Sequence, residues 1–443
     1  MNILILNHYA GSPQYGMEFR PYYMGRELVK LGHQVSIIAA DHSHLRRKNP
    51  RFPDDLHEEV LDGVRYIWVK TPEYERNNLR RAWNILTYLR KVGRHAQAFA
   101  EVLRPDAVIA SSTYPNDFAL AKKIADFSGG RAYFEIHDLW PLSPMVLYHL
   151  KENNPLIRWL QKGEDEALSQ SEKVLSILPA ADKHIKERGF DPTKFIYVPN
   201  GIVPSDAETP LSSSIHGDAM EMLRQAGKFI VLYVGGFADA NALEPFVLSG
   251  LHLNESVQLV LVGDGMQKEK MVELANRHNL QNVSFLPPIP KNQVPALLKL
   301  ADCLYIGAKR CALYQYGIGM NKLYDYMLSG RPVICGIEAA NDPVSEAKCG
   351  LTIPPEDDKA IAKAIQAMRE LRPEGRDSLG YNGRQYVLAH HNYADLAQRF
   401  LAALQPEGKQ SEKIASPLPN LDFPKDLPET PDKEKENDAD MSL

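Results

Sequence analysis

The sequence predicts an α/β protein made of two doubly wound parallel sheets that face each other across a cleft. Short, unbroken and β-branched apolar runs recur along the chain, as expected for strands that are buried on both faces. Segments of helical period lie between several of these runs, and this alternation predicts parallel sheets covered by helices. A stretch rich in proline, serine and acidic residues at 199–218 interrupts the pattern once. We interpret this stretch as a linker between two domains.

The length and composition are those of an ordinary soluble protein. The chain has 443 residues, enough for two or three domains, with 44% hydrophobic and 24% charged residues. No stretch approaches the about 18 uncharged apolar residues of a membrane-spanning helix, and the apolar start "MNILIL" is too short for a signal-peptide core. The four cysteines form no CxxC pair, so we expect reduced core thiols at Cys303, Cys311, Cys335 and Cys349. Together these features predict a cytoplasmic protein.

The first domain, placed at 1–200, begins with the apolar run "NILIL". Amphipathic segments at 18–31 and 116–127 are expected to form helices that cover its sheet. The expected strands of this sheet are the apolar runs at 2–6, 33–40, 64–69, 106–111, 132–137, 173–178 and 194–199.

The second domain, placed at 201–387, repeats the same alternation. Its expected strands lie at 228–236, 257–265, 282–286, 302–307 and 331–336. Ligands of open α/β sheets bind at the carboxyl ends of the strands, so the cleft between the two sheets is where we expect the chemistry.

The final segment, 405–443, differs in composition from the rest of the chain. It holds ten acidic and five basic residues, a balance of −5 that equals the net charge of the whole protein. With six prolines and almost no aromatic residues, it cannot bury enough apolar surface to become ordered. We therefore expect a disordered acidic tail without a catalytic role.

A glycine-bearing loop follows the first expected strand and allows two interpretations. The glycines Gly11 and Gly16 would let backbone amides approach an anion, with Gly16 on the side of a phosphate-bearing donor. Gly11, Glu18 and Arg20 would then lie on the acceptor side. Alternatively, the glycines only make a structural turn.

Two later segments also suggest a phosphate site. In "LVGDG", Gly263 and Gly265 follow a strand and precede a helix, an arrangement that suits phosphate but also an ordinary turn. Lys322 and Asp325 are three residues apart and share one helical face. They are either a surface ion pair or a pair that grips a sugar nucleotide, with the lysine facing phosphate and the carboxylate facing the ribose diol.

The order of these motifs resembles a known family. The segments "NHYAGSPQYGMEFRPYYMGREL", "FEIHDLWP", "VPNGI", "LVGDG" and "NKLYDYMLSGRPVI" are similar in type and order to GT-B-fold glycosyltransferases of family 4. The likeness is greatest to the bacterial enzymes that build O-antigen and capsule sugars, and it runs from about residue 1 to 404. It implies a GT-B architecture of two Rossmann-like domains. It also implies that a last helix, about 388–404, returns to the first domain.

The resemblance assigns roles to individual residues. His137 lies where the family has a histidine near the donor sugar, although a histidine that ends a strand is often a core residue. Asp325 lies at the position of the glutamate that holds the ribose, with one methylene less. Gly317 replaces a second glutamate, so contacts to the sugar would come from the backbone of 317–321, including Gly319 and Asn321.

The family usually clamps the donor diphosphate with an arginine and a lysine that this chain lacks. Gly236 and Asn241 are found near those positions, so we expect Lys322 to substitute, with Arg310 as a helper. The resemblance implies retention of the anomeric configuration, with the leaving phosphate assisting the acceptor. No acidic metal-binding pair is evident, so neither an obligatory metal nor a cofactor is expected.

Three functions are compatible with these residues. The leading hypothesis is transfer of a sugar from a nucleotide donor, most simply a UDP-sugar, to a lipid-linked saccharide. A UDP-sugar 2-epimerase shares the fold, and the missing glutamate and clamp also leave room for a degenerate nucleotide-sugar-binding protein. No nucleic-acid partner is expected.

A basic amphipathic segment at 76–100 suggests peripheral docking to the inner face of the membrane. Its cations are Arg76, Arg80, Arg81, Arg90, Lys91 and Arg94, and it contains no acidic residue before Glu101. The apolar side would come from Leu79, Trp83 and Leu86 together with Tyr88 and Leu89. The alternative is an ordinary helix whose apolar side packs on the sheet.

Overall fold

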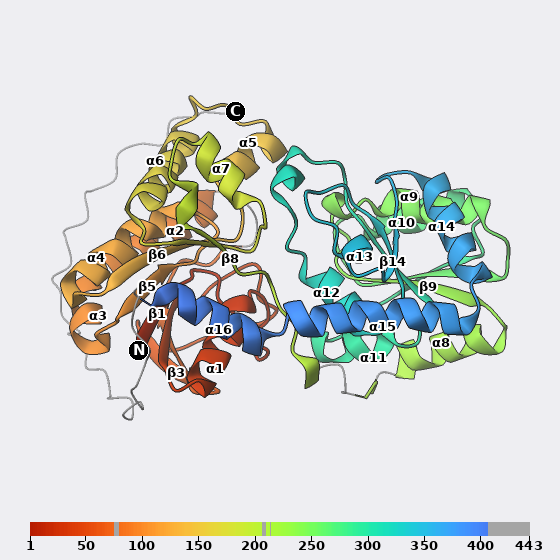
Figure 1. Cartoon of the computed structure of the whole chain (residues 1–443), viewed down its shortest axis with the longest axis horizontal. Coiled ribbons are helices and arrows are strands. Elements are labelled where there is room, and N and C mark those ends of the chain that lie inside the picture. Colours follow the sequence, from red (N-terminus) through yellow and green to blue (C-terminus); the bar gives the residue numbers. More distant parts are fainter. Residues whose placement is uncertain (75–78, 206–209, 213, 406–443) are drawn as a thin grey trace.

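The computed structural model shows two α/β domains that lie side by side (Figure 1). It describes residues 1–74, 79–205, 210–212 and 214–405. The fold class predicted from the sequence is confirmed: each domain has one predominantly parallel sheet with helices packed against it. The expected acidic tail beyond Gln405 and the cation Arg76 lie outside the described residues.

The N-terminal domain has an eight-stranded sheet in the order β3-β4-β2-β1-β5-β6-β7-β8. All neighbouring strands are parallel except β3, which pairs antiparallel with β4. The strands are β1 (Asn2–Leu6), β2 (Gln34–Ala40), β3 (His57–Leu61), β4 (Val64–Val69), β5 (Ala107–Ala110), β6 (Arg131–Ile136), β7 (Val174–Ser176) and β8 (Phe195–Tyr197). The helices are α1 (Arg20–Lys30), α2 (Leu79–Arg94), α3 (Ala96–Leu103), α4 (Phe118–Ser128), α5 (Leu142–Tyr148), α6 (Pro155–Gln170) and α7 (Ala181–Glu187).

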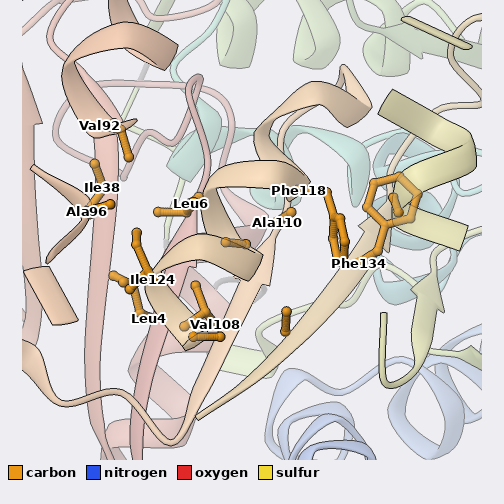
Figure 2. Packing of buried hydrophobic residues seen from close by; sticks show 14 of the residues in the cluster. Leu4, Leu6, Ile38, Val92, Ala96, Val108, Ala110, Phe118, Ile124 and Phe134 are labelled. Carbon is orange, nitrogen blue, oxygen red and sulfur yellow. The ribbon is translucent and has the colours of Figure 1, made fainter. Parts of the chain in front are cut away.

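Strand β1 shows why both faces of this sheet are apolar. Side chains alternate along a strand, so Leu4 and Leu6 point to one face and Ile3 and Ile5 to the other. The first face packs against helices that include α4, whose Phe118 lies near Phe134 of β6 (Figure 2). The second face is covered by α1 and by the last helix of the chain.

The C-terminal domain has a six-stranded parallel sheet in the order β11-β10-β9-β12-β13-β14. Its strands are β9 (Phe229–Val234), β10 (Val257–Val262), β11 (Val283–Leu286), β12 (Cys303–Gly307), β13 (Val333–Gly336) and β14 (Gly350–Thr352). Its helices are α8 (Ser214–Gln225), α9 (Leu243–Leu248), α10 (Lys268–Arg277), α11 (Val294–Leu298), α12 (Asn321–Leu328), α13 (Pro343–Glu346), α14 (Asp358–Glu370) and α15 (Pro373–His390). All four cysteines are free thiols, and Cys311 is half-buried, whereas the other three are buried as expected.

The segment 388–404, which was expected to form one helix, contains the end of α15 and the whole of α16. Helix α15 ends at His390, and α16 (Tyr393–Leu404) begins after Asn392, whose side chain accepts a hydrogen bond from the amide of Ala394. This cap satisfies a first-turn amide and allows the chain to change direction between the two helices. Helix α15 packs on α12 of the C-terminal domain, whereas α16 packs on α1 of the N-terminal domain (Figure 1).

The chain passes between the two domains twice, once near Ile202 and once near His391, and these two crossings lie side by side. The amide of Ile202 donates to the carbonyl of His391 at 2.6 Å, and the amide of Tyr393 donates to the carbonyl of Ile202 at 3.2 Å. The ring of His391 stacks on Tyr324 of α12 at 3.8 Å between centroids. The crossings therefore form one paired hinge that contacts both domains.

No helix in the described ranges is long and apolar enough to span a bilayer.

Candidate active site

The candidate site is formed where the carboxyl ends of the two sheets approach each other. Adjacent strands β5 and β6 pair Ala110 with Phe134, and this register places Ser111 beside Glu135. His137 follows directly after β6, at the same sheet edge. On the facing domain, helix α12 brings Lys322 to the end of β9.

His137 is held by two oxygen atoms. Its Nε2 lies 2.9 Å from Ser111 Oγ and 3.1 Å from Glu135 Oε2, and its side chain is 12% exposed. Ser111 donates its own hydrogen to Glu135 at 2.6 Å, and an ionised carboxylate only accepts. Nε2 must therefore carry a hydrogen. In the neutral imidazole this leaves Nδ1 as a hydrogen-bond acceptor.

The carboxylate beside His137 is strongly held in its charged form. Burial by itself would raise the pKa of the Glu135 carboxyl, but the charge of Arg20 and the contacts with His137 and Ser111 hold this pKa well below its usual range. Glu135 is therefore ionised at neutral pH.

The prediction that Arg20 contacts an acceptor is wrong. The Arg20 side chain is 1% exposed, and its guanidinium donates to Glu135 and to carbonyls of the segment 198–200. A buried guanidinium with these partners is held in place and cannot reach a ligand. Glu18 is half-buried, and among the described residues no hydrogen bond is seen for its carboxylate, so its acceptor-side role stays a prediction.

The loop after β1 makes a tight turn, and the amides expected to receive an anion are already bonded. The Gly11 amide donates to the carbonyl of Glu18 at 2.8 Å, and the Gly16 amide donates to the carbonyl of Ser12 at 2.7 Å. A Cβ on Gly11 would lie only 1.9 Å from the Gly16 carbonyl oxygen. The structural interpretation of these glycines therefore holds, and the anion-binding one does not.

The glycines of "LVGDG" serve close backbone packing. A Cβ on Gly263 would lie 1.9 Å from the carbonyl oxygen of Gly235, and one on Gly265 would lie 2.7 Å from the Phe237 carbonyl oxygen. Both glycines have positive φ angles of 145° and 149°, which other residues rarely adopt. Their amides donate to Leu286 and to Asp264, so neither is free for phosphate.

Lys322 lies against Gly235, in the turn that follows β9. Its Nζ donates to the Tyr233 hydroxyl at 2.8 Å and lies 4.5 Å from the centre of that ring. A Cβ on Gly235 would meet Lys322 Nζ at 2.7 Å, so the ammonium occupies the space that this glycine leaves open. No carboxylate among the described residues forms an ion pair with Lys322, and burial lowers the pKa of its ammonium to about 8.

Asp325 and Arg310 both have partners of opposite charge. The Asp325 carboxylate forms an ion pair with Lys291, just before α11. Arg310 follows β12 and lies 2.9 Å from Glu338, with both side chains well exposed. The Arg310 pair is exposed on both sides and the Lys291 side of the other pair is exposed, and such pairs contribute little to stability, so a ligand can displace either one.

Gly317 and Gly319 pack against the N-terminal domain. A Cβ on Gly317 would lie 2.4 Å from Pro179, and the Gly317 amide already donates to the carbonyl of Tyr314. A Cβ on Gly319 would lie 3.1 Å from Ile177. The expectation that the Gly317 amide contacts a sugar is therefore wrong. The Gly319 and Asn321 assignments stay predictions.

A separate hollow of about 520 Å³ lies between α5, α6 and α7. Its buried Glu164 contacts His184 at 2.7 Å, and its Arg188 contacts Asp165 at 2.7 Å. Because these charges are already paired with each other, we place the chemistry at His137 and Lys322. No cluster of three metal-ligating side chains occurs among the described residues, and the predicted independence from metal stays a prediction.

Sequence reasoning missed Glu135, Asn200 and the contacts that Arg20 makes. One signal was available: Glu135 is a lone charge in the otherwise apolar run "AYFEIH". A charged residue at a strand position that should be buried needs a partner, and Arg20 supplies it.

Comparisons with known proteins agree with this architecture. The sequence profile of Glycosyltransferase Family 4 matches residues 15–206, and that of Glycosyl transferases group 1 matches residues 221–386. The putative colanic acid biosynthesis glycosyl transferase WcaI of Escherichia coli is 25% identical over 47% of this chain and 52% of its own length. The probable glycosyltransferase WbjE of Pseudomonas aeruginosa is 20% identical over 61% of this chain and 67% of its own length.

The fold itself has solved relatives. HepE from Anabaena, determined in complex with UDP and glucose, superposes with a TM-score of 0.64 at 13% identity, covering 91% of this chain and 99% of HepE. The two profile matches follow one another along the chain and coincide with its two sheets, so the chain belongs to the GT-B glycosyltransferases of family 4.

Proposed function

We propose that this protein transfers a sugar from a UDP-sugar to a lipid-linked saccharide during the synthesis of a bacterial surface polysaccharide such as O-antigen or capsule, with retention of configuration. The observation that carries the proposal is the Lys322 ammonium, which lies at the glycine turn after β9 without a carboxylate partner among the described residues. The names of WcaI and WbjE, and the UDP bound to HepE, support the same reaction class.

Lys322 would stabilise the donor diphosphate. The charge on the leaving diphosphate grows in the transition state, and a cation fixed at that place stabilises it most in a site with little water. Gly235 has no side chain, and this lets the ammonium lie directly against the turn after β9. Arg310 can swing from its exposed partner Glu338 to assist.

His137 would orient the donor sugar. Its bare Nδ1 accepts a hydrogen bond, and sugar hydroxyls are donors. The residue has no role as a nucleophile in this proposal. The leaving phosphate takes the proton of the incoming acceptor hydroxyl, which delivers the acceptor on the same face and retains the configuration.

The reaction is tested with radiolabelled UDP-sugars and a membrane lipid extract. We expect label in the lipid fraction. Formation of an isomeric UDP-sugar without transfer would identify an epimerase, which shares the fold. UDP binding without any turnover would identify a binding protein, an outcome that the absent side chain at Gly317 keeps open.

Asp325 is proposed to hold the ribose diol, and its mutation gives a direct test. Asp325→Ala should weaken UDP binding by on the order of 1–3 kcal/mol, or about 5- to 150-fold in Kd, because two hydroxyls lose a charged acceptor. Lys291→Ala is the matched control, since it removes only the exposed ion-pair partner of Asp325 and should change Kd by at most about threefold. Calorimetry measures both. Equal UDP affinity in Asp325→Ala and the wild type would exclude Asp325 as the ribose ligand.

Helix α2 supports the proposed docking to an anionic membrane. Leu79, Trp83 and Leu86 are 88%, 60% and 48% exposed and follow one another on a single face. The opposite face is buried, and it includes Tyr88, which the sequence analysis had placed on the docking side. The apolar residues of the helix therefore do not all pack on the sheet.

Some cations of α2 are exposed to solvent, and others contact residues of the N-terminal domain. Arg80, Arg90 and Arg94 are exposed, close to the apolar stripe. Arg81 instead lies over the ring of Tyr9, and Lys91 forms an ion pair with Asp55. An apolar stripe flanked by arginines suits an interface of acyl chains and anionic headgroups. The proposed lipid-linked acceptor would be reached from that surface.

A further inference from the structure

A buried chain of polar contacts connects His137 to the hinge between the domains. Arg20 donates from Nε and Nη2 to a single oxygen of Glu135, Oε1, at 3.0 and 2.8 Å. The other oxygen, Oε2, receives Ser111 and contacts His137. The two oxygens of one carboxylate therefore have separate partners.

The guanidinium also holds the first crossing. Its Nη1 donates to the carbonyl of Pro199 at 2.6 Å, and its Nη2 donates to the carbonyl of Val198 at 2.8 Å. The side chain of the next residue, Asn200, donates to the carbonyl of Gly319 in the C-terminal domain at 2.7 Å. Gly319 lies two residues before α12, which carries Lys322. The segment 198–200 is therefore linked by hydrogen bonds both to His137, through Arg20 and Glu135, and to the segment that leads into α12.

We propose that Glu135 and Arg20 are positioning residues: Arg20 fixes which carboxylate oxygen faces His137, and that oxygen fixes the histidine tautomer that meets the sugar. This inference rests on the proposed function, because it assumes that His137 contacts the donor sugar. Arg20 itself touches no substrate. It acts only through the orientation of Glu135.

The substitution Glu135→Gln makes the proposal sharply testable. Guanidinium groups only donate, so Arg20 will draw the amide oxygen of the glutamine to the place of Oε1. The amide nitrogen then takes the place of Oε2 and presents only hydrogens to His137. Only an unprotonated Nε2 can accept one of these hydrogens, so we expect the hydrogen of the imidazole to move to Nδ1. The Nδ1 atom of His137, which accepts a hydrogen bond from the sugar in our proposal, then becomes a hydrogen-bond donor.

The first measurement is the ¹⁵N NMR spectrum of the histidine rings in the full-length protein, at a pH where the imidazole is neutral. His137→Ala assigns the His137 signals. We expect an Nε2-protonated ring in the wild type and an Nδ1-protonated ring in Glu135→Gln. This measurement needs no turnover, so it tests the inference even if the proposed transfer reaction is wrong. Retention of the Nε2-protonated form in Glu135→Gln overturns the inference.

The second measurement is kinetic. Glu135→Gln should lower kcat about 10- to 100-fold while the donor KM stays within about threefold, because a wrong tautomer harms the reaction more than it harms binding. In the His137→Ala background the same change should cost less than about twofold, because Glu135 acts through His137. If Glu135→Gln lowers kcat about 10- to 100-fold in the His137→Ala background as well, then Glu135 has only a structural role.

Two further variants control for folding. Glu164→Gln changes another buried glutamate, which contacts His184 at 2.7 Å, and should leave the His137 signals and kcat unchanged. Ser111→Ala removes the neighbouring hydroxyl and keeps Glu135, so the Nε2-protonated form should persist. If Ser111→Ala instead moves the hydrogen to Nδ1, then Ser111 and not Glu135 sets the tautomer, and the inference fails. Ser111→Ala thus decides the question if Glu135→Gln does not fold.

Discussion

Replacing Lys322 with alanine should lower kcat roughly 100- to 1,000-fold, the range observed when one donor to a developing anion is removed. The ammonium lies over the turn after β9 and is not paired with any carboxylate in the described part of the chain. The diphosphate gains charge as the sugar leaves, so the loss should fall mainly on kcat, with a smaller rise in donor KM. Steady-state kinetics on the transfer assay measures both.

Two controls separate charge from shape. Lys322→Met keeps most of the side-chain volume against Tyr233 and should lose as much activity as Lys322→Ala. Lys309→Ala removes another lysine near the carboxyl end of β12, which is paired with Asp239, and should cost at most about threefold. An unchanged kcat in Lys322→Ala would show that another group stabilises the diphosphate.

The pH profile of the wild type gives an independent check of the same residue. Burial lowers the pKa of the Lys322 ammonium to about 8, so the group is charged below this pH and loses its proton above it. The value of kcat/KM, which reports the free enzyme, should therefore be level below pH 8 and fall above it. The residual activity of Lys322→Met should lack this alkaline fall.

The sequence predicted the parallel strands well because each is a self-contained apolar run, whereas β3 was not among the predicted strands. Strand β3 reads "HEEVL" and is at the edge of the sheet, where burial does not demand an apolar run. A local signal was nevertheless present. Asp62 and Gly63 join β3 to β4 with φ angles of 48° and 82°, as expected for an Asp-Gly hairpin turn.

The glycine loops show where sequence reasoning about the site could not succeed. Glycine serves both for the approach of an anion and for the approach of another backbone, and the sequence does not distinguish the two. The deciding atoms, such as the Gly235 carbonyl oxygen beside Gly263, come from segments far away in the chain. The same holds for Arg20, whose partner Glu135 is 115 residues away. Lys322 could be chosen as a candidate site residue because the sequence places it three residues from Asp325 on one helical face.

Reversing the exposed arginines of α2 should abolish the proposed attachment to membranes. Each cation near an anionic surface contributes about 1 kcal/mol, so changing Arg80, Arg90 and Arg94 to glutamate removes about 3 kcal/mol of attraction and adds repulsion. We expect a fall of at least about 100-fold in partitioning onto vesicles that contain phosphatidylglycerol. Arg81 and Lys91 are left in place, because they hold Tyr9 and Asp55 within the domain.

Sedimentation with these vesicles at low salt measures the effect, and the apolar stripe is tested separately. Trp83→Ser with Leu86→Ser keeps every charge and should also weaken binding, because the side chains that enter the interface are lost. The matched control changes Lys359, Lys363 and Arg369 on α14 to glutamate, which alters the net charge equally on the C-terminal domain. Docking through α2 predicts that the control sediments with vesicles like the wild type. Equal loss in both triple variants would mean that binding follows only net charge, and absence of wild-type binding at low salt would remove the membrane from the proposal.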